Sequence, residues 1–291
     1  MVSVKINYQE DIKMAEGCTH DCSSCSLNCP SKSGGVQKDA ANPKSNVKHI
    51  IAVVSGKGGV GKSLVTSMLA VHLNRKGYSV GILDADVTGP SIPKAFGFNE
   101  DVEGDGEGNM LPPMTTTGIK IMSVNLMLED ETRPVIWRGS MISNTVRQFW
   151  KDTAWEDLDF LLVDCPPGTG DVPLTVFQSL PIDGIVIVSS PQELVSMIVK
   201  KAANMADMMN VPVLGLVENM SFVKCPDCGK EIKIFGDSHI EDIANEFGYE
   251  LLAKVPIDTE VASYVDKGWI EMTKSTYLEA AADRLAEKCG C

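Results

Sequence analysis

The segment SGKGGVGKS, residues 55–63, holds residue types whose spacing suits phosphate binding. It fits two patterns at once: the dinucleotide pattern G-x-G-x-x-G and the phosphate-loop pattern G-x-x-x-x-G-K-[ST]. The second pattern explains two more residues, because Lys62 would reach the β- and γ-phosphates of a nucleotide and the Ser63 hydroxyl would bind Mg²⁺. Backbone amides of such a loop point at the phosphates, reinforced by the dipole of the following helix. The residues expected to bind the nucleotide are Gly56, Gly58, Gly59, Val60, Gly61, Lys62 and Ser63.

Acidic residues follow two apolar runs of the sequence. Asp84 and Asp86 lie in LDADVTGPS, and Asp164 lies in LLVDCPPGTGD. A phosphate loop requires an acid at the end of a later strand as the partner of magnesium, and Asp164 fits that position. Asp84 would supply the acid at the end of the second strand that a dinucleotide site needs, and helix capping is the alternative for either acid of the first pair.

A separate CxxC pair, Cys225 and Cys228, lies in KCPDCGK. Two thiolates do not complete a metal site that usually has four ligands, so three interpretations compete: a redox dithiol, half of a zinc or iron-sulfur site completed within the chain, or half of one completed by a second copy. The following GKEIKIFG is typical of a hairpin rather than of the helix that a thioredoxin-type dithiol opens. The downstream cysteines, Cys289 and Cys291, lie at a terminus where disorder is expected. A two-fold axis between two copies would make a four-thiolate site, although thiolates do not decide between zinc and an iron-sulfur cluster.

The N-terminal segment holds a second group of cysteines that needs no partner chain. Four ligands are present within twelve residues, followed by Pro30 as in the C-P that closes ferredoxin runs, so a cluster or a zinc ion within one chain is expected, with His20 as a competing zinc ligand. The first three also match the CxxxCxxC pattern of radical enzymes that use S-adenosylmethionine, but a fourth cysteine could fill the iron position that those enzymes leave open. These cysteines are Cys18, Cys22, Cys25 and Cys29.

The elements that must position these residues alternate between short apolar strands and helical patterns. The sequence predicts an α/β fold with a doubly wound, mostly parallel sheet, in which ligands gather at the carboxyl ends of the strands. We expect a cysteine-rich segment over 1–30, a linker rich in Gly, Ser, Pro and Lys over 31–46, and the main domain over 47–291. The acidic, Gly- and Pro-rich stretch 99–118 is expected to form a surface insertion or hairpin.

Composition narrows the function classes. The net charge of -13 disfavours a general nucleic-acid or anionic-membrane binder, because phosphates would repel such a surface. The N-terminus lacks the basic and apolar regions of a secretory signal, and the apolar runs are too short for a membrane helix, so we expect a cytoplasmic protein. In the cytosol, nine cysteines are expected as reduced thiols or metal ligands.

The motifs GKGGVGKS, LDADVTGPSIP, WRG, DCPPGTGD, ENMSF and CPDC occur in this order. Together they resemble the Mrp and nucleotide-binding-protein-like iron-sulfur carrier ATPases (the ApbC type), relatives of MinD, ParA and the nitrogenase iron protein. The resemblance covers about residues 47–270 and implies a P-loop ATPase of the deviant Walker A class that hydrolyses ATP slowly. It also implies a homodimer whose bridging [4Fe-4S] cluster is held by Cys225 and Cys228 and delivered to apo-proteins. A partitioning or positioning ATPase and an electron-transfer protein like the nitrogenase iron protein are the alternatives.

The resemblance also assigns roles to single residues. It implies that Lys57 reaches the phosphates of the partner subunit, that Asp86 orients the attacking water and that Asp84 lies near the magnesium ion. It further implies that Asn219, in ENMSF, binds the adenine edge. Pro256 and Asp258, in VPID, are expected on the same base-binding side.

Overall fold

The structure is a computed structural model that describes residues 38–86, 91–98, 102–127, 139–168, 170–191 and 195–291. The described residues belong to one compact unit, Lys38–Cys291. The four N-terminal cysteines, and with them the expected cluster or zinc site over 1–30, lie outside the described residues.

A seven-stranded parallel sheet forms the centre of this unit, with the order β11-β8-β7-β1-β6-β2-β5. The predicted fold class is thereby confirmed. Alternate residues of the first strand belong to different apolar cores, Ile50 and Ala52 to one and Ile51 and Val53 to the other, as expected for a strand buried on both faces. The strands are β1 (Ser45–Val54), β2 (Val80–Asp84), β5 (Lys120–Ser123), β6 (Glu156–Asp164), β7 (Gly184–Ser189), β8 (Val213–Glu218) and β11 (Leu251–Lys254).

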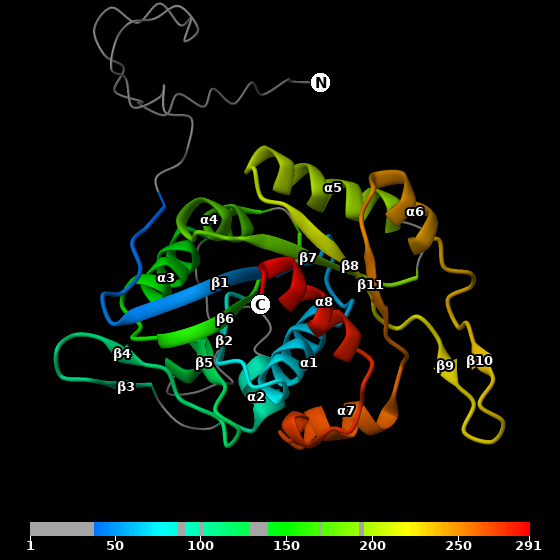
Figure 1. Cartoon of the computed structure of the whole chain (residues 1–291), viewed down its shortest axis with the longest axis horizontal. Coiled ribbons are helices and arrows are strands. Elements are labelled where there is room, and N and C mark those ends of the chain that lie inside the picture. The colour runs from blue at the N-terminus through cyan, green and yellow to red at the C-terminus, as the bar shows by residue number, and fades with distance from the viewer. Residues whose placement is uncertain (1–37, 87–90, 99–101, 128–138, 169, 192–194) are drawn as a thin grey trace, which may run out of the picture. The chain divides into compact units, whose positions relative to one another are not determined.

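Helices cover both faces of the sheet (Figure 1). Helices α3, α4, α5 and α6 pack against one face, and α1, α2, α7 and α8 against the other. None of the helices in the described part of the chain combines the length and the hydropathy that a bilayer span requires. The helices are α1 (Lys62–Arg75), α2 (Ile92–Phe96), α3 (Gly139–Lys151), α4 (Asp171–Ser179), α5 (Val195–Met208), α6 (Ile240–Phe247), α7 (Thr259–Asp266) and α8 (Glu279–Cys289), with 3-10 turns η1 (Val124–Met127) and η2 (Ile270–Met272).

Two antiparallel hairpins extend from this layered unit. The first, β3 (Glu103–Gly104) with β4 (Met110–Leu111), lies in the acidic insertion, which confirms the expected hairpin there. The second, β9 (Val223–Lys224) with β10 (Glu231–Ile232), carries the CxxC pair and projects away from the sheet in Figure 1. The predicted hairpin around the cysteines is confirmed as well.

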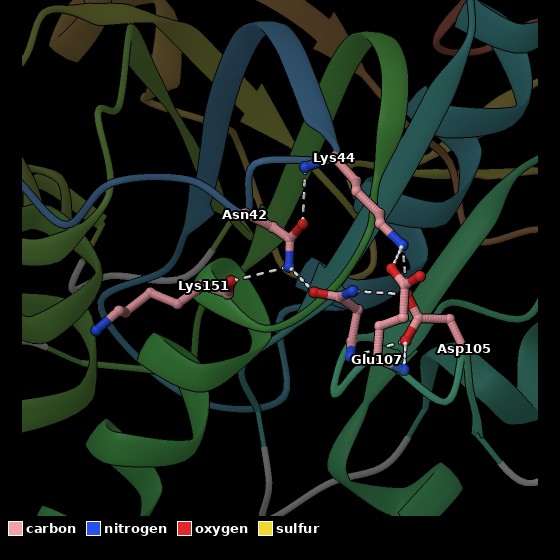
Figure 2. Close-up of polar contacts among 6 residues, drawn as sticks. Asn42, Lys44, Asp105, Glu107 and Lys151 are labelled. Carbon is pink, nitrogen blue, oxygen red and sulfur yellow. Dashed lines mark hydrogen bonds and ion pairs between the residues drawn. The ribbon is translucent and has the colours of Figure 1, made fainter.

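The segment before β1 is tied to the domain by polar contacts (Figure 2). The Asn42 amide is 3% exposed and donates to Asn109 Oδ1 at 2.8 Å and to the Lys151 carbonyl at 3.1 Å. The Lys44 ammonium lies 2.7 Å from Asp105 Oδ2 in the first hairpin. These contacts place the segment within the folded unit.

Two expected boundaries therefore differ from the structure. Residues 38–46, expected as part of a linker, belong to the compact unit, because polar side chains that resemble a solvated linker in sequence find partners on distant elements. The chain end was expected to be disordered, but α8 continues to Cys289, and the Cys291 amide donates to the Ala286 carbonyl at 3.0 Å. Gly290, with a φ of 81°, permits this left-handed helix end.

Candidate nucleotide site and thiol site

The loop between β1 and α1 borders a cavity of about 300 Å³ at the carboxyl edge of the sheet. Gly59 and Gly61 have φ angles of 79° and 75°, a conformation that glycine adopts without strain. Helix α1 begins directly after Gly61, so its unpaired amides face the loop. The cavity is lined by Ser55, Gly58, Gly59, Val60, Gly61, Lys62, Ser63, Leu64, Asp86, Ser91, Ala95, Pro167 and Val265.

Two predicted loop residues are not part of this lining. A side chain at Gly56 would come within 2.3 Å of the Ile198 methyl group on α5, so close packing of a helix explains this glycine. Lys57 is half-buried, and its carbonyl accepts a hydrogen bond from the Ser55 hydroxyl at 3.0 Å.

The Lys62 ammonium and the Asp164 carboxylate lie at the centre of the site. Lys62 is 5% exposed, and its Nζ lies 2.7 Å from Asp164 Oδ1 and 3.8 Å from Asp86 Oδ2. Asp164 also accepts hydrogen bonds from the hydroxyls of Ser63 and Thr66, the latter at 2.7 Å. The acid at the end of β6 is thus brought to the first turn of α1, where the sequence pattern predicts it.

Asp84 lies beside Asp164, because the two residues are in register on neighbouring strands β2 and β6. Asp84 accepts hydrogen bonds from the Ser123 hydroxyl at 2.9 Å and from the Asp86 amide at 3.0 Å. Burial raises the pKa of Asp84 to about 8, and the nearby Asp164 charge acts in the same direction. The Ser63 hydroxyl and these carboxylates form an oxygen donor set, the kind that Mg²⁺ prefers.

A second cavity of about 200 Å³ adjoins the loop. Its lining includes all three residues that the sequence places on the base-binding side, Asn219, Pro256 and Asp258. The Asn219 amide donates to the Val60 carbonyl at 2.9 Å, so Asn219 also braces the phosphate loop. The Asp258 carboxylate caps α7 by accepting from the Glu260 amide at 2.8 Å, which gives its side chain a structural role in addition to the expected one.

Cys225 and Cys228 lie in the turn of the β9–β10 hairpin. Cys225 is half-buried and Cys228 is exposed. The turn is closed by bonds from the Cys225 amide to the Lys230 carbonyl and from the Gly229 amide to the Cys225 carbonyl, both 2.9 Å. Hydrogen bonds to the Cys225 sulfur, from the Cys228 amide first and then from the Asp227 amide and the Cys228 thiol, lower the pKa of Cys225. The hairpin therefore favours an anionic sulfur, the form that binds metals.

The described residues do not complete a metal site around this pair. No group of three or more His, Cys, Asp or Glu side chains placed to hold a metal ion occurs in the part of the chain that the structure describes. Cys289, whose pKa burial raises to about 11, packs against the core beneath α8 and its neighbours rather than on the hairpin. Within the described ranges, the hairpin offers two thiols for a metal or a cluster.

Sequence patterns missed several residues of the nucleotide site. Thr66 binds Asp164 one turn after Ser63, and Ser123 binds Asp84 from the end of β5. The second cavity is also lined by Tyr277, whose hydroxyl donates to Asp258 at 2.8 Å. A hydroxyl that directly follows the apolar run IKIM was the available signal for Ser123, but no local pattern distinguishes Thr66 or Tyr277.

Several known proteins are similar to this chain in sequence. A family model described as "ParA: NUBPL iron-transfer P-loop NTPase" matches residues 46–289. The "Iron-sulfur cluster carrier protein" of Clostridium perfringens is 47% identical over 265 residues, covering 86% of this chain and 93% of its own. The protein of the same name from Methanocaldococcus jannaschii is 47% identical over 261 residues, covering 88% and 90%.

Solved structures show the same fold. A nucleotide-binding protein of Archaeoglobus fulgidus in complex with ADP has a TM-score of 0.73 and 42% identity, covering 80% of this chain and 91% of its own. The cell division ATPase MinD of Pyrococcus furiosus has a TM-score of 0.61 at 20% identity, covering 83% and 99%, and this likeness concerns the fold alone. On the extent of the family match and the identity of these relatives, the chain belongs to the NUBPL iron-transfer P-loop NTPases of the ParA group.

Proposed function

We propose that this protein is an ATP-hydrolysing carrier that holds a [4Fe-4S] cluster between two copies of the chain and transfers it to apo-proteins. The observation that carries the proposal is the CxxC hairpin, which presents two thiols and lowers the pKa of Cys225. Two copies related by a two-fold axis would supply the four thiolates that such a cluster needs. The relatives named as carriers support this cargo.

The nucleotide side of the proposal rests on the loop cavity. Loop amides and Lys62 would bind the phosphates of ATP, and the second cavity would hold the base against Asn219. Mg²⁺ would be held by Ser63, with Asp164 and Asp84 beside it, and would neutralise phosphate charge when bound. Asp86, which borders the cavity, would orient the attacking water.

The remaining expectations belong to the same proposal. The cysteines of residues 1–30 would hold a second [4Fe-4S] cluster or a zinc ion within one chain. The carrier would be a cytoplasmic homodimer that binds apo iron-sulfur proteins, and neither nucleic acid nor membranes. The acidic net charge of -13 supports the last point.

Anaerobic reconstitution of the full chain with iron and sulfide, followed by Mössbauer spectroscopy and iron analysis, tests the cluster. We expect wild type to bind a [4Fe-4S] cluster and to transfer it to an apo-protein. Cys225→Ala should lose the bridging cluster, because each dimer then keeps only two of its four thiolates. Cys291→Ala removes an exposed thiol outside the hairpin, and this variant should keep the bridging cluster.

Deletion of residues 1–37 separates the two cysteine groups without entering the folded unit. The truncated protein should keep one cluster per dimer and remain sensitive to Cys225→Ala. A bridging cluster that survives Cys225→Ala in the truncated protein would overturn the assignment to the hairpin.

A further inference from the structure

Glu218, the last residue of β8, is a fully buried carboxyl group without a role in the proposed chemistry. Its Oε2 accepts a hydrogen bond from the Ser221 hydroxyl, and its Oε1 accepts one from the Ser238 hydroxyl at 2.5 Å. Ser221 lies just before β9 and Ser238 lies just before α6. One side chain of the sheet therefore holds both the entering and the leaving segment of the cysteine hairpin.

The next residue along the chain, Asn219, contacts the phosphate loop. Its amide donates to the Val60 carbonyl at 2.9 Å, and a methyl group added at Gly61 would come within 2.2 Å of its nitrogen. Successive side chains at a strand end point to opposite faces of a sheet. The end of β8 thus places Asn219 on the loop side and Glu218 on the hairpin side, with one peptide bond between them.

Backbone hydrogen bonds join the end of β8 to residues that line the second cavity. The Val255 amide donates to the Glu218 carbonyl at 2.8 Å, and the Ser221 amide donates to the Val255 carbonyl at 2.9 Å. The Ile257 amide donates to the Phe222 carbonyl at 2.8 Å, which extends this pairing toward the hairpin. Val255 and Ile257 both line the second cavity. A base bound there would therefore contact the segment that is hydrogen-bonded to the residues just before β9.

We propose that Glu218 is a positioning residue that couples the nucleotide site to the two hairpin thiols through Ser221 and Ser238. This inference rests on the proposed function, in which nucleotide and cluster bind the same protein. A nucleotide that orders the loop and the second cavity also holds the end of β8 in place. Because the Glu218 carboxylate binds Ser221 and Ser238, the segments on both sides of the hairpin are then held in place as well. By thermodynamic reciprocity, a ligand on the thiols then changes nucleotide affinity by the same factor.

A third hydroxyl lies next to Glu218 and would give its carboxylate an alternative hydrogen-bond donor to Ser221 or Ser238. Ser189 is in register with Glu218 on the neighbouring strand β7, and its buried hydroxyl has no hydrogen-bond partner among the described residues. Neighbouring strands lie about 5 Å apart and in-register side chains share a face, so Ser189 and Glu218 lie on the same side of the sheet. Exchange of one serine for another would release one leg of the hairpin while the carboxylate stays satisfied.

Hydrogen-exchange mass spectrometry on the cluster-free full chain, with and without MgADP, tests the coupling. Titration calorimetry first establishes that each variant binds MgADP. In wild type, MgADP should slow amide exchange of residues 223–238 by about fivefold or more. Ser221→Ala and Ser238→Ala should bring this ratio close to one. Glu218→Gln, which keeps the shape but loses one acceptor atom, should lower it in part.

The control variant is Ser45→Ala at the opposite end of the sheet. It removes a hydroxyl that donates to the Thr153 carbonyl and accepts from the Trp155 amide, and it should keep the wild-type ratio. A purely structural role would accelerate exchange of the hairpin equally with and without MgADP, and the ratio would stay at the wild-type value. That result, or a wild-type hairpin that ignores MgADP while calorimetry shows binding, overturns the proposal. A failure of the proposed function would appear separately, as wild type that binds no cluster on reconstitution.

Discussion

At the scale of single residues, the nucleotide site depends on close contacts that leave little room for change. Asp164 is fully buried and is satisfied by Lys62, Ser63 and Thr66 at once. A buried carboxylate with several donors is costly to disturb, because removal of one donor leaves a charged group short of partners. The side-chain amide of Asn219 stabilises the loop by donating a hydrogen bond to the Val60 carbonyl.

Two loop glycines give a matched test of that bracing. Gly59 and Gly61 both have left-handed φ angles, but a side chain at Gly59 meets open space, whereas one at Gly61 meets the Asn219 nitrogen at 2.2 Å. We expect Gly59→Ala to lower the free energy of unfolding by about 1–2 kcal/mol, the cost of a left-handed alanine. Gly61→Ala should cost a further ~1–3 kcal/mol for overpacking. Urea unfolding without nucleotide measures both, and equal losses would contradict the bracing contact.

At the scale of elements, helix α1 contributes residues to the nucleotide site at its N-terminal end and packs in the core toward its C-terminal end. Its first residue is Lys62, and near its last turn His72 is buried against the other elements with 3% exposure. His72 Nε2 has no hydrogen-bond partner among the described residues. Burial lowers the pKa of His72 below its ordinary value of 6.5, and the Arg75 charge adds to this effect.

Acid should therefore weaken the packing of α1 through His72. The folded protein binds this proton less tightly than the unfolded chain, so the stabilisation is fully present above pH 6.5 and is lost as the pH falls below it. The slope for one proton is at most about 1.4 kcal/mol per pH unit. We expect His72→Leu to lose less stability than wild type between pH 7 and about pH 5.5 in urea unfolding.

The control for this prediction is Met68→Leu, a volume-conserving change on the buried part of the same helix that removes no titratable group. Its acid-side slope should equal that of wild type. A His72→Leu variant with an unchanged slope would show that other groups account for the acid dependence.

At the scale of the whole molecule, the proposed chemistry needs two copies of the chain. The hairpin supplies half of the expected thiolates, and Lys57, which is half-buried and absent from the lining of its own loop cavity, is expected to act on the partner's phosphates. Both proposed roles require a closed dimer, so cluster binding and ATP hydrolysis are expected to require association of two copies.

The two loop lysines should separate binding from hydrolysis. Lys62→Ala should weaken ATP binding about 10- to 100-fold, because a hydrogen bond from a charged group is worth about 1.5–3 kcal/mol. Lys57→Ala should leave the Kd for ATP within about twofold but lower kcat about 10²- to 10³-fold, as loss of a group that stabilises transition-state charge does. Calorimetry and steady-state ATPase assays measure the two effects. If Lys57→Ala weakens binding as strongly as Lys62→Ala, Lys57 acts on its own nucleotide.

The sequence alone determined the fold class, the loop and the hairpin, because each is encoded by local patterns. Apolar runs that end in Asp84 and Asp164 predict parallel strands with acids at the same edge, and the structure places these residues in register. The glycines around Lys62 likewise predict a loop that opens a helix, and α1 begins there.

Only the tertiary structure decided which distant side chains complete these motifs. Gly56 fits a phosphate-binding pattern, yet this position requires glycine because a side chain there would collide with Ile198 on α5. From the sequence, Glu218 is only the end of an apolar strand. Its hydrogen bonds with Ser221 and Ser238 form because the chain returns to this strand after the hairpin. The physical reason is that periodicity and spacing report contacts along the chain, whereas the partner of a buried polar group is set by the packing of elements far apart in sequence.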